Sequence, residues 1–198
     1  MKSNSFSKNL EIAKLAVLSA IVIVMTFVPY VGYINYGALS ITLIHIPVII
    51  GACVLGIKGG LVLGTVWGTS CMIKAILMPP SPLEGIIFKN PLVSIIPRIA
   101  AGFVAALVYT LLCKKFKRKE ILSGISALCG CLTNTILVMG SIYVIYGSKY
   151  SEELGIGSVS FGGLTNYILA AFTINAVIEI VAAVAITIPV AKALRKKY

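Results

Sequence analysis

The sequence predicts an all-α membrane protein whose six helices cross the bilayer, with the N-terminus and the C-terminus both in the cytoplasm. Hydrophobic residues make up 59% of the chain, and the mean hydropathy is +1.02, more than a soluble domain of this length carries. The 17 Lys and Arg outnumber the six acids, and most of them lie in three clusters separated by long apolar stretches. Such clusters mark cytoplasmic loops, so the net charge of +11 indicates topology and not nucleic-acid binding.

Six apolar stretches approach the length of about 20 residues that a helix needs to cross the hydrocarbon core. They cover residues 10–30, 39–55, 61–78, 91–113, 121–146 and 164–191. The first ends near Pro29, and a polar, aromatic loop is expected at 31–37. The second is short and is interrupted by Pro47. A tight turn at 56–60 separates the second span from the third.

The remaining boundaries are marked by prolines, polar segments and basic residues. The third span ends at a proline-rich segment, 79–82, and a loop is expected at 83–90. The fourth stops at the basic run 114–119. A polar loop at 147–163 separates the last two spans, and the sixth runs into a basic tail.

An even number of spans places both termini on the same side of the membrane. That side carries the basic residues of both termini, of the turn at Lys58 and of the run 114–119, whereas the opposite loops carry only Lys89 and Lys149. The bias predicts cytoplasmic termini in a multi-pass protein of the cell membrane. The whole chain, residues 1–198, is expected to form a single integral membrane domain.

Nothing in the sequence predicts a catalytic residue, a metal site or a cofactor. The five cysteines lie within or at the ends of apolar runs, and the Cys129-Gly130-Cys131 pair lacks the further ligands of a metal site. There is no Walker sequence, no H-E-x-x-H motif and no aspartate. The polar residues form no recognisable pair of nucleophile and base, so the sequence favours binding or transport over catalysis.

Two stripes of small residues predict close helix contacts. In the third span, Gly60, Gly64 and Gly68 recur every four residues, which predicts a packing seam inside the protein. The first span carries a second stripe, which consists of Ala13, Ala16 and Ala20. On the pattern alone, the alanine stripe is either an internal seam, the favoured interpretation, or a docking face for another protein.

A few polar residues lie at membrane depth, where they are costly and mark functional sites. Arg98 is seven residues into the fourth span, about 10 Å below the outer surface at 1.5 Å per residue. Lys74 and His45 lie toward the outer ends of the third and second spans, and Glu179 lies near the middle of the sixth. Structural alternatives remain open: Lys74 snorkels, His45 only packs, or Glu179 pairs with Arg98 or His45.

Aromatic and amide side chains near the outer ends complete a predicted cavity that opens to the outside. Loop tyrosines and asparagines surround it, and Asn90 is expected to cap the fourth helix. The full set of candidate substrate-binding residues is Arg98, Lys74, His45, Asn35, Tyr36, Asn90, Asn134, Tyr143, Asn166, Asn175 and Glu179.

At this level of detail the chain resembles the S components, the substrate-binding membrane subunits of energy-coupling factor (ECF) vitamin transporters. The resemblance covers essentially the whole chain, and the pantothenate type is the most similar. It is carried by the Ala16-x-x-x-Ala20 stripe, the segment 40–52 around His45 and Pro47, the turn 55–60 and the stretch 81–98 that ends in Pro97-Arg98. The turn usually reads Leu-Gly-Pro in that family, and Ile57 replaces the proline here.

The resemblance implies an S-component-like bundle in the lipid bilayer that captures a vitamin at its outer face. It implies docking on a transmembrane coupling protein served by two ECF ATPases, followed by toppling in the membrane to release the vitamin inside. In that family the alanine stripe faces the coupling protein, which favours the docking interpretation of Ala13, Ala16 and Ala20.

The substrate expected from the resemblance is pantothenate, and several alternatives stay open. Arg98 suits the pantothenate carboxylate because a guanidinium fork matches it, with Lys74 or His45 assisting. The alternative substrates are hydroxymethylpyrimidine, pyridoxine and riboflavin. A neutral or cationic pyrimidine would instead favour Glu179 and aromatic stacking. A self-sufficient secondary transporter is the alternative of another class, and a membrane-embedded enzyme is a third.

Overall fold

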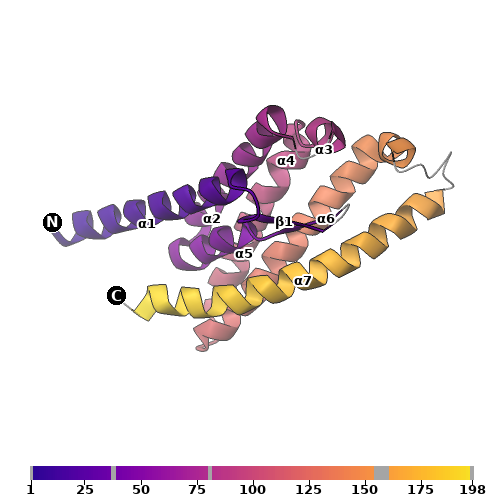
Figure 1. Ribbon diagram of the computed structural model, residues 1–198. Helices are drawn as coiled ribbons and strands as arrows, with labels where there is room; N and C mark the ends of the chain where they lie inside the picture. The colour runs from indigo at the N-terminus through magenta and orange to yellow at the C-terminus, as the bar shows by residue number, and fades with distance from the viewer. Residues whose placement is uncertain (1, 37–38, 80–81, 154–160, 197–198) are drawn as a thin grey trace.

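The computed structural model describes the backbone of residues 2–36, 39–79, 82–153 and 161–196, and the side chains of residues 8–33, 41–79, 84–146 and 176–194. This part of the chain forms a helical bundle with one small hairpin (Figure 1). Its elements are α1 (Lys2–Phe27), β1 (Tyr33–Tyr36), β2 (Leu39–Thr42), α2 (His45–Leu77), α3 (Pro82–Ile87), α4 (Pro91–Ser94), α5 (Ile96–Cys113), α6 (Lys119–Glu153) and α7 (Phe161–Lys196).

Within the described residues, five helical segments are long and apolar enough to cross a membrane. They are Lys8–Phe27, His45–Leu77, Pro91–Cys113, Lys119–Tyr146 and Ala176–Leu194. The prediction of a mostly helical, multi-pass membrane protein is therefore confirmed. The number differs from the predicted six because the second and third predicted spans both fall in α2.

Helix α2 folds back on itself at Gly56. This residue has φ 69° and ψ −157° inside an otherwise helical segment, a conformation that glycine adopts without steric cost. The ring centroids of His45 and Trp67 are only 6.4 Å apart, whereas a straight helix would separate residues 45 and 67 by about 33 Å. The first arm, residues 45–55, is about 16 Å long, roughly half the thickness of the hydrocarbon core.

The segment before α2 differs from its prediction. The second span was expected to begin near Leu39, but Leu39–Thr42 is strand β2, which pairs antiparallel with β1 across a register of Tyr33 with Thr42. Leu-Ser-Ile-Thr alternates apolar and polar residues, and Tyr-Ile-Asn-Tyr is rich in aromatic and β-branched residues, which suits a hairpin. The predicted all-α class therefore omits one two-stranded sheet.

Other loop predictions also change. The expected polar loop at 147–163 is shorter, because α6 continues to Glu153 and α7 begins at Phe161. The expected turn at 56–60 is reduced to the break at Gly56, because the residues after it are already helical. The expected loop at 83–90 contains the short helix α3. The segments at 56–60 and 83–90 both contain glycine, and the chain is helical beyond each of them.

The predicted glycine seam is confirmed as an internal contact between α2 and α5. A Cβ atom built on Gly60 would overlap the carbonyl oxygen of Gly102, one on Gly64 would meet the backbone of Arg98, and one on Gly68 would meet that of Ile95. The partner positions descend as the glycines ascend, so the two helices run antiparallel with their backbones in contact. Such an approach gives dispersion contacts that larger residues would prevent.

Substituting Gly60→Ala is expected to destabilise the protein by about 1–3 kcal/mol, because the added methyl group forces these two backbones apart. The measurement is the thermal unfolding midpoint of the detergent-solubilised protein. Gly140→Ala is the matched control, since a Cβ at Gly140 meets no atom within 4 Å. Equal midpoints for the two variants would show that the seam is not tightly packed.

Helix α1 packs through the side opposite its alanines. Leu18, Val22 and Thr26 are buried, and their spacing of four residues places them along one face. Ala13, Ala16 and Ala20 are all exposed in this chain. The pattern alone favoured an internal packing seam for these three alanines, and that interpretation is therefore wrong.

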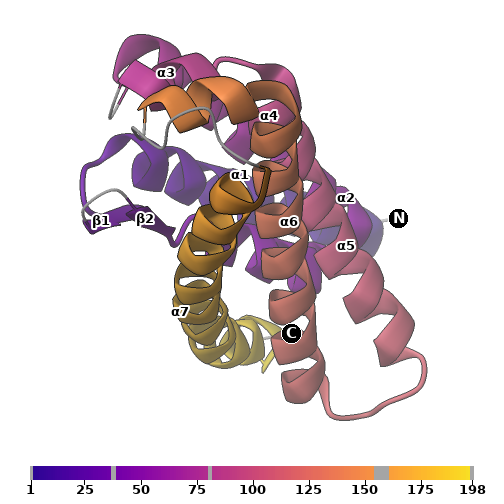
Figure 2. The ribbon, with the colours of Figure 1, turned by 90° about the vertical axis from the view of Figure 1, so that its right-hand side faces the viewer.

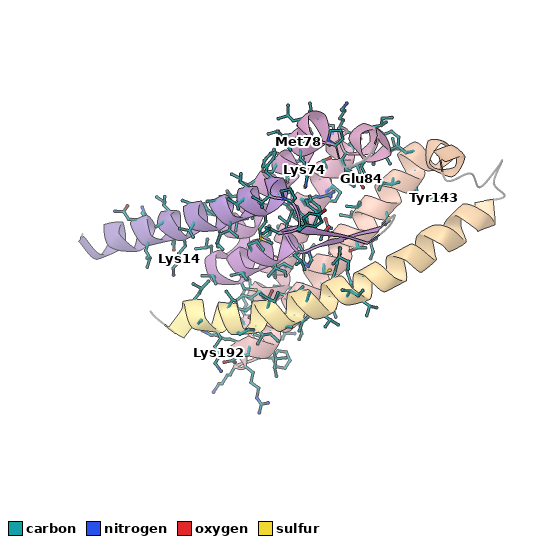
Figure 3. The ribbon with its side chains drawn as sticks, viewed as in Figure 1. Lys14, Lys74, Met78, Glu84, Tyr143 and Lys192 are labelled. Atoms are coloured by element: carbon teal, nitrogen blue, oxygen red, sulfur yellow. The ribbon has the colours of Figure 1, made fainter. Side chains whose placement is uncertain are left out.

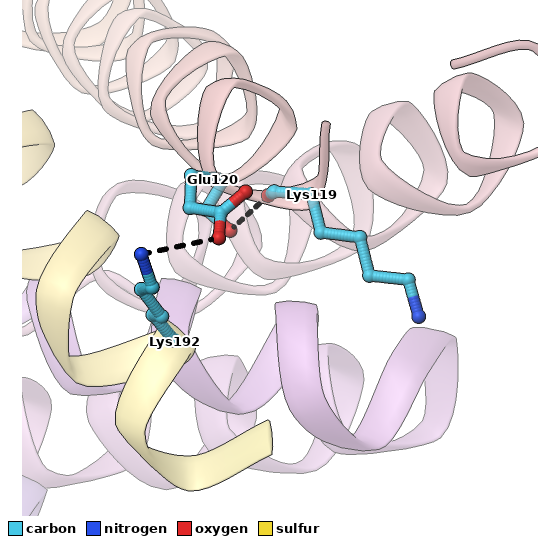
Figure 4. Close-up of polar contacts among 4 residues, drawn as sticks. Lys119, Glu120 and Lys192 are labelled. Carbon is cyan, nitrogen blue, oxygen red and sulfur yellow. Dashed lines mark hydrogen bonds and ion pairs between the residues drawn. The ribbon is translucent and has the colours of Figure 1, made fainter. Parts of the chain in front are cut away.

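The first turn of α6 lies beside the last turns of α7 (Figure 2). Lys192 Nζ is 3.5 Å from Glu120 Oε1, and Figure 4 shows the Lys119 side chain directed away from this ion pair. The start of α1 lies at the same end of the molecule as the end of α7 (Figure 1). We call this the basic end, after Lys14, Lys192 and the 114–119 run.

Candidate substrate-binding site

The side chain of Arg98 is enclosed by two aromatic rings. Its guanidinium carbon lies 5.4 Å from the Trp67 ring centroid and 5.3 Å from that of Phe88, within the range of a cation–π interaction. Nη1 donates a hydrogen bond of 2.5 Å to the Val93 carbonyl, and the residue is 6% exposed. The Nε atom is buried and has no hydrogen-bond partner among the described residues.

The connection from α3 to α4 fixes the groups around Arg98. As predicted, Asn90 caps the fourth helical segment: its Oδ1 accepts a hydrogen bond of 3.0 Å from the Leu92 amide. Asn90 Nδ2 also donates to the Tyr146 hydroxyl at 3.4 Å. Ser94 Oγ donates to the Phe88 carbonyl. Phe88 and the Val93 carbonyl are thereby held on either side of the cap.

A second cation lies on the same face of α2 as Trp67. Residues 67, 71 and 74 follow the i, i+4, i+7 spacing that places side chains along one helix face. Lys74 Nζ is 4.2 Å from the ring centroid of Tyr33, on β1. The Tyr33 hydroxyl and Cys71 Sγ share a hydrogen bond of 3.0 Å, so Cys71 does more than fill space, which is all the sequence predicted for it.

Tyr33, which contacts both Cys71 and Lys74, keeps its hydroxyl proton. Burial raises the pKa of the Tyr33 hydroxyl well above its ordinary value, and Cys71 raises it further, while the charge of Arg98 opposes the rise. Two opposing effects also act on Glu84, on α3. Burial raises the pKa of its carboxyl group, and the positive charge of Lys74 lowers it. Figure 3 shows Lys74, Met78, Glu84 and Tyr143 at the end of the molecule opposite Lys14 and Lys192.

Several buried polar atoms on different helices have no hydrogen-bond partner in the described part of the chain. They are both ring nitrogens of His45, Nε1 of Trp67, Nε of Arg98 and Oδ1 of Asn134. Buried polar atoms are rarely left unpaired in folded proteins. A polar molecule bound beside these atoms would supply the missing hydrogen bonds. The hydroxyls of Ser126, near the start of α6, and of Thr187, near the end of α7, also have no hydrogen-bond partner among the described residues.

Glu179 has a different partner from the two that the sequence suggested. It is 6% exposed, and its Oε1 accepts a hydrogen bond of 2.7 Å from the Thr42 amide. In the described structure it makes no ion pair with Arg98 or His45.

Apart from Glu179, the expected site residues divide into three groups. Arg98 and His45 both adjoin Trp67, and Lys74 lies on the same face of α2. Asn90 is the N-cap of α4, and Asn134 and Tyr143 lie on α6. The side chains of Asn35, Tyr36, Asn166 and Asn175 lie outside the described residues.

Sequence reasoning missed the two rings that enclose Arg98. The sequence pattern assigns Trp67 no role in the site, and Phe88 falls in the expected loop at 83–90. The helical spacing from Lys74 back to residue 67 is a signal that could have identified Trp67. No comparable local pattern points to Phe88, because its position depends on α3 and on the Asn90 cap.

The chain is similar to known proteins along most of its length. A family model described as "ECF transporter, substrate-specific component" matches residues 10–191. A relative named pantothenic acid transporter PanT, from Lactococcus lactis subsp. cremoris, is 32% identical over 188 residues, which cover 87% of this chain and 93% of the relative. A relative named pantothenate transporter PanT, from Leuconostoc mesenteroides subsp. mesenteroides, is 26% identical over 185 residues, or 90% of this chain and 88% of the relative.

Proposed function

Because this chain belongs to the family of substrate-specific components of ECF transporters, we propose that it binds pantothenate at its outer face and delivers it inward through an ATP-driven coupling module. Membership confirms the family expected from the sequence, and with it a membrane transport component and not an enzyme. The choice of pantothenate is supported by the names of the two relatives and by the chemistry around Arg98.

The buried guanidinium of Arg98 is the observation that carries the substrate assignment. One nitrogen is committed to the Val93 carbonyl, and Nε is unpaired. Trp67 and Phe88 hold the charged group in place without neutralising it. A cation buried at membrane depth needs an anion or polar partners, and a carboxylate fits the donor fork of arginine. Pantothenate carries such a carboxylate.

The other polar groups suit the neutral part of the molecule. The hydroxyls and the amide of pantothenate need both donors and acceptors, which His45, Asn134 and Asn90 supply. Tyr143, Asn35, Tyr36, Asn166 and Asn175 complete the proposed lining. Lys74 supplies a second positive charge beside Tyr33, so the site as a whole favours an anionic vitamin.

The proposed orientation places both termini in the cytoplasm. The start of α1 and the end of α7 lie together at the basic end (Figure 1), and basic residues favour the cytoplasmic side. Lys74 and Glu84 lie at the other end (Figure 3), which would face the outside.

The proposed partners are a transmembrane coupling protein and two ECF ATPases. Their docking face is the stripe formed by Ala13, Ala16 and Ala20. These alanines are exposed, and they lie on the side of α1 that faces away from the buried Leu18 and Val22. Small residues on an unoccupied helix face let a second helix approach closely in lipid.

A thermal-shift and calorimetric screen of the purified protein against B vitamins and their precursors tests the substrate. Pantothenate is expected to stabilise the protein selectively, with a shift that grows with its concentration as mass action requires. Selective stabilisation by a pyrimidine or a pyridine would keep the family and overturn pantothenate. Stabilisation by no member of the panel would overturn the vitamin assignment.

A further inference from the structure

The β1–β2 hairpin is attached to the bundle through both residues of one cross-strand pair, Tyr33 and Thr42. On one side, the Tyr33 hydroxyl shares its hydrogen bond with Cys71 Sγ, and Lys74 Nζ lies over the tyrosine ring. On the other side, the Thr42 amide donates to Glu179 Oε1 at 2.7 Å, where the hairpin lies beside α7 (Figure 2). The same pair is therefore tied to α2 and to α7.

The strand register explains why the Thr42 amide is available. The Leu43 amide donates to the Gly32 carbonyl at 2.9 Å, so Gly32 and Leu43 form a hydrogen-bonded pair. Facing residues in an antiparallel ladder alternate between hydrogen-bonded and non-hydrogen-bonded pairs. The next pair, Tyr33 and Thr42, is therefore of the second kind, and the Thr42 amide points away from β1. It stands on a free strand edge, where it needs another acceptor.

Glu179 supplies that acceptor from within an apolar helix. The segment Ala176–Leu194 has a mean hydropathy of 2.1, and a carboxylate is costly in such a segment unless it is paired. The hydrogen bond to Thr42 is the pairing that the structure shows. When the carboxylate is ionised, this hydrogen bond is charge-assisted and stronger than one between neutral groups.

We propose that Glu179 is a positioning residue: it fastens the hairpin to α7 through the Thr42 amide and does not contact the vitamin. The position of Thr42 matters because the chain enters α2 three residues later, at His45, and because its strand partner is Tyr33. Holding Thr42 therefore sets the places of two groups that border the candidate site. The effect on vitamin binding rests on the proposed function, whereas the attachment of the hairpin does not.

Two substitutions separate the hydrogen bond from the charge. Glu179→Gln keeps an oxygen acceptor and removes the charge, whereas Glu179→Leu removes both. The first readout is amide hydrogen exchange by mass spectrometry on the full chain in lipid nanodiscs, without vitamin, over peptides that contain Thr42. Glu179→Leu is expected to speed exchange at Thr42 by about tenfold or more, the factor for losing a hydrogen bond to a charged group. Glu179→Gln is expected to stay near the wild type.

The second readout is the pantothenate dissociation constant. Glu179→Leu is expected to raise it, and Glu179→Gln is expected to restore a value close to the wild type. Glu120→Leu is the matched control, because this glutamate belongs to an ion pair at the basic end. It should change neither the exchange at Thr42 nor the affinity.

A third variant tests the bond from the donor side. Thr42→Pro removes the amide hydrogen and leaves the carboxylate intact. It is expected to weaken pantothenate binding as much as Glu179→Leu does, and combining the two should add little, as for two partners of one interaction. This variant also keeps the test informative if Glu179→Leu does not fold.

Three results would overturn the proposal. The first is wild-type exchange at Thr42 in the folded Glu179→Leu protein. The second is a loss of affinity in Glu179→Gln that equals the loss in Glu179→Leu, since the charge itself would then act on the vitamin or on Arg98. The third is wild-type affinity in the folded Thr42→Pro protein. If the wild type does not bind pantothenate, the proposed function fails, and the exchange comparison still decides whether Glu179 holds the hairpin.

Discussion

Replacing Arg98 with alanine is expected to weaken pantothenate binding by roughly 2–5 kcal/mol, the cost of truncating one partner of a buried, hydrogen-bonded charge pair. The large effect follows from the environment of the guanidinium. It is 6% exposed and lies between the rings of Trp67 and Phe88. In the alanine variant, water therefore substitutes poorly for the guanidinium. The vitamin carboxylate would be left without a counter-charge in a medium of low polarity.

Isothermal titration calorimetry on the detergent-solubilised protein measures this loss. Arg98→Lys is the matched variant: it keeps the charge and loses the planar fork, so it should recover only part of the affinity. The alcohol analogue of pantothenate, in which a hydroxyl group replaces the carboxylate, should bind the wild type and Arg98→Ala with similar affinity. Unchanged pantothenate affinity in a folded Arg98→Ala protein would exclude Arg98 as the carboxylate partner.

Tryptophan at Ala16 or Ala20 is expected to abolish vitamin uptake and to leave pantothenate affinity nearly unchanged. Both alanines are exposed on α1, and the residues that pack α1 onto the bundle lie on its other side. A large ring there blocks close approach of a partner helix without disturbing the fold. Uptake is measured in cells that carry the coupling proteins, and affinity is measured on the purified variants.

Ile21→Trp is the matched control for the docking face. Ile21 is 42% exposed and follows Ala20 directly, so it points about 100° around the helix from the alanine stripe. Uptake should persist in this variant. Loss of vitamin binding in a folded Ala16→Trp protein would contradict the docking role, as would full uptake.

The parts of the fold that the sequence predicted are those governed by local pattern. The four-residue spacing of Gly60, Gly64 and Gly68 identified a seam because close packing in lipid depends on side-chain size. Asn90 before Pro91 identified a helix cap because the capping side chain bonds within its own turn. Long apolar stretches identified the spanning helices because the bilayer sets their length.

The parts that were missed depend on contacts between distant segments. The strand at Leu39–Thr42 lies beside a long apolar run, and its pairing with β1 is decided by a partner that hydropathy does not detect. The hydrogen bond from Thr42 to Glu179 joins residues 137 positions apart. The rings around Arg98 are brought together by α2 and α3. Within the candidate site, the sequence therefore identified the cations and not the groups that hold them.

The position of Trp67 has a practical consequence for spectroscopy. It is the only tryptophan in the chain, it is fully buried, and its ring centroid is 5.4 Å from the charged carbon of Arg98. The emission of an indole depends on the electric field at its ring, and a cation at this distance contributes to that field. The protein thus carries its one tryptophan beside the charge that an anionic vitamin would neutralise, so occupancy can be followed by tryptophan emission without any label.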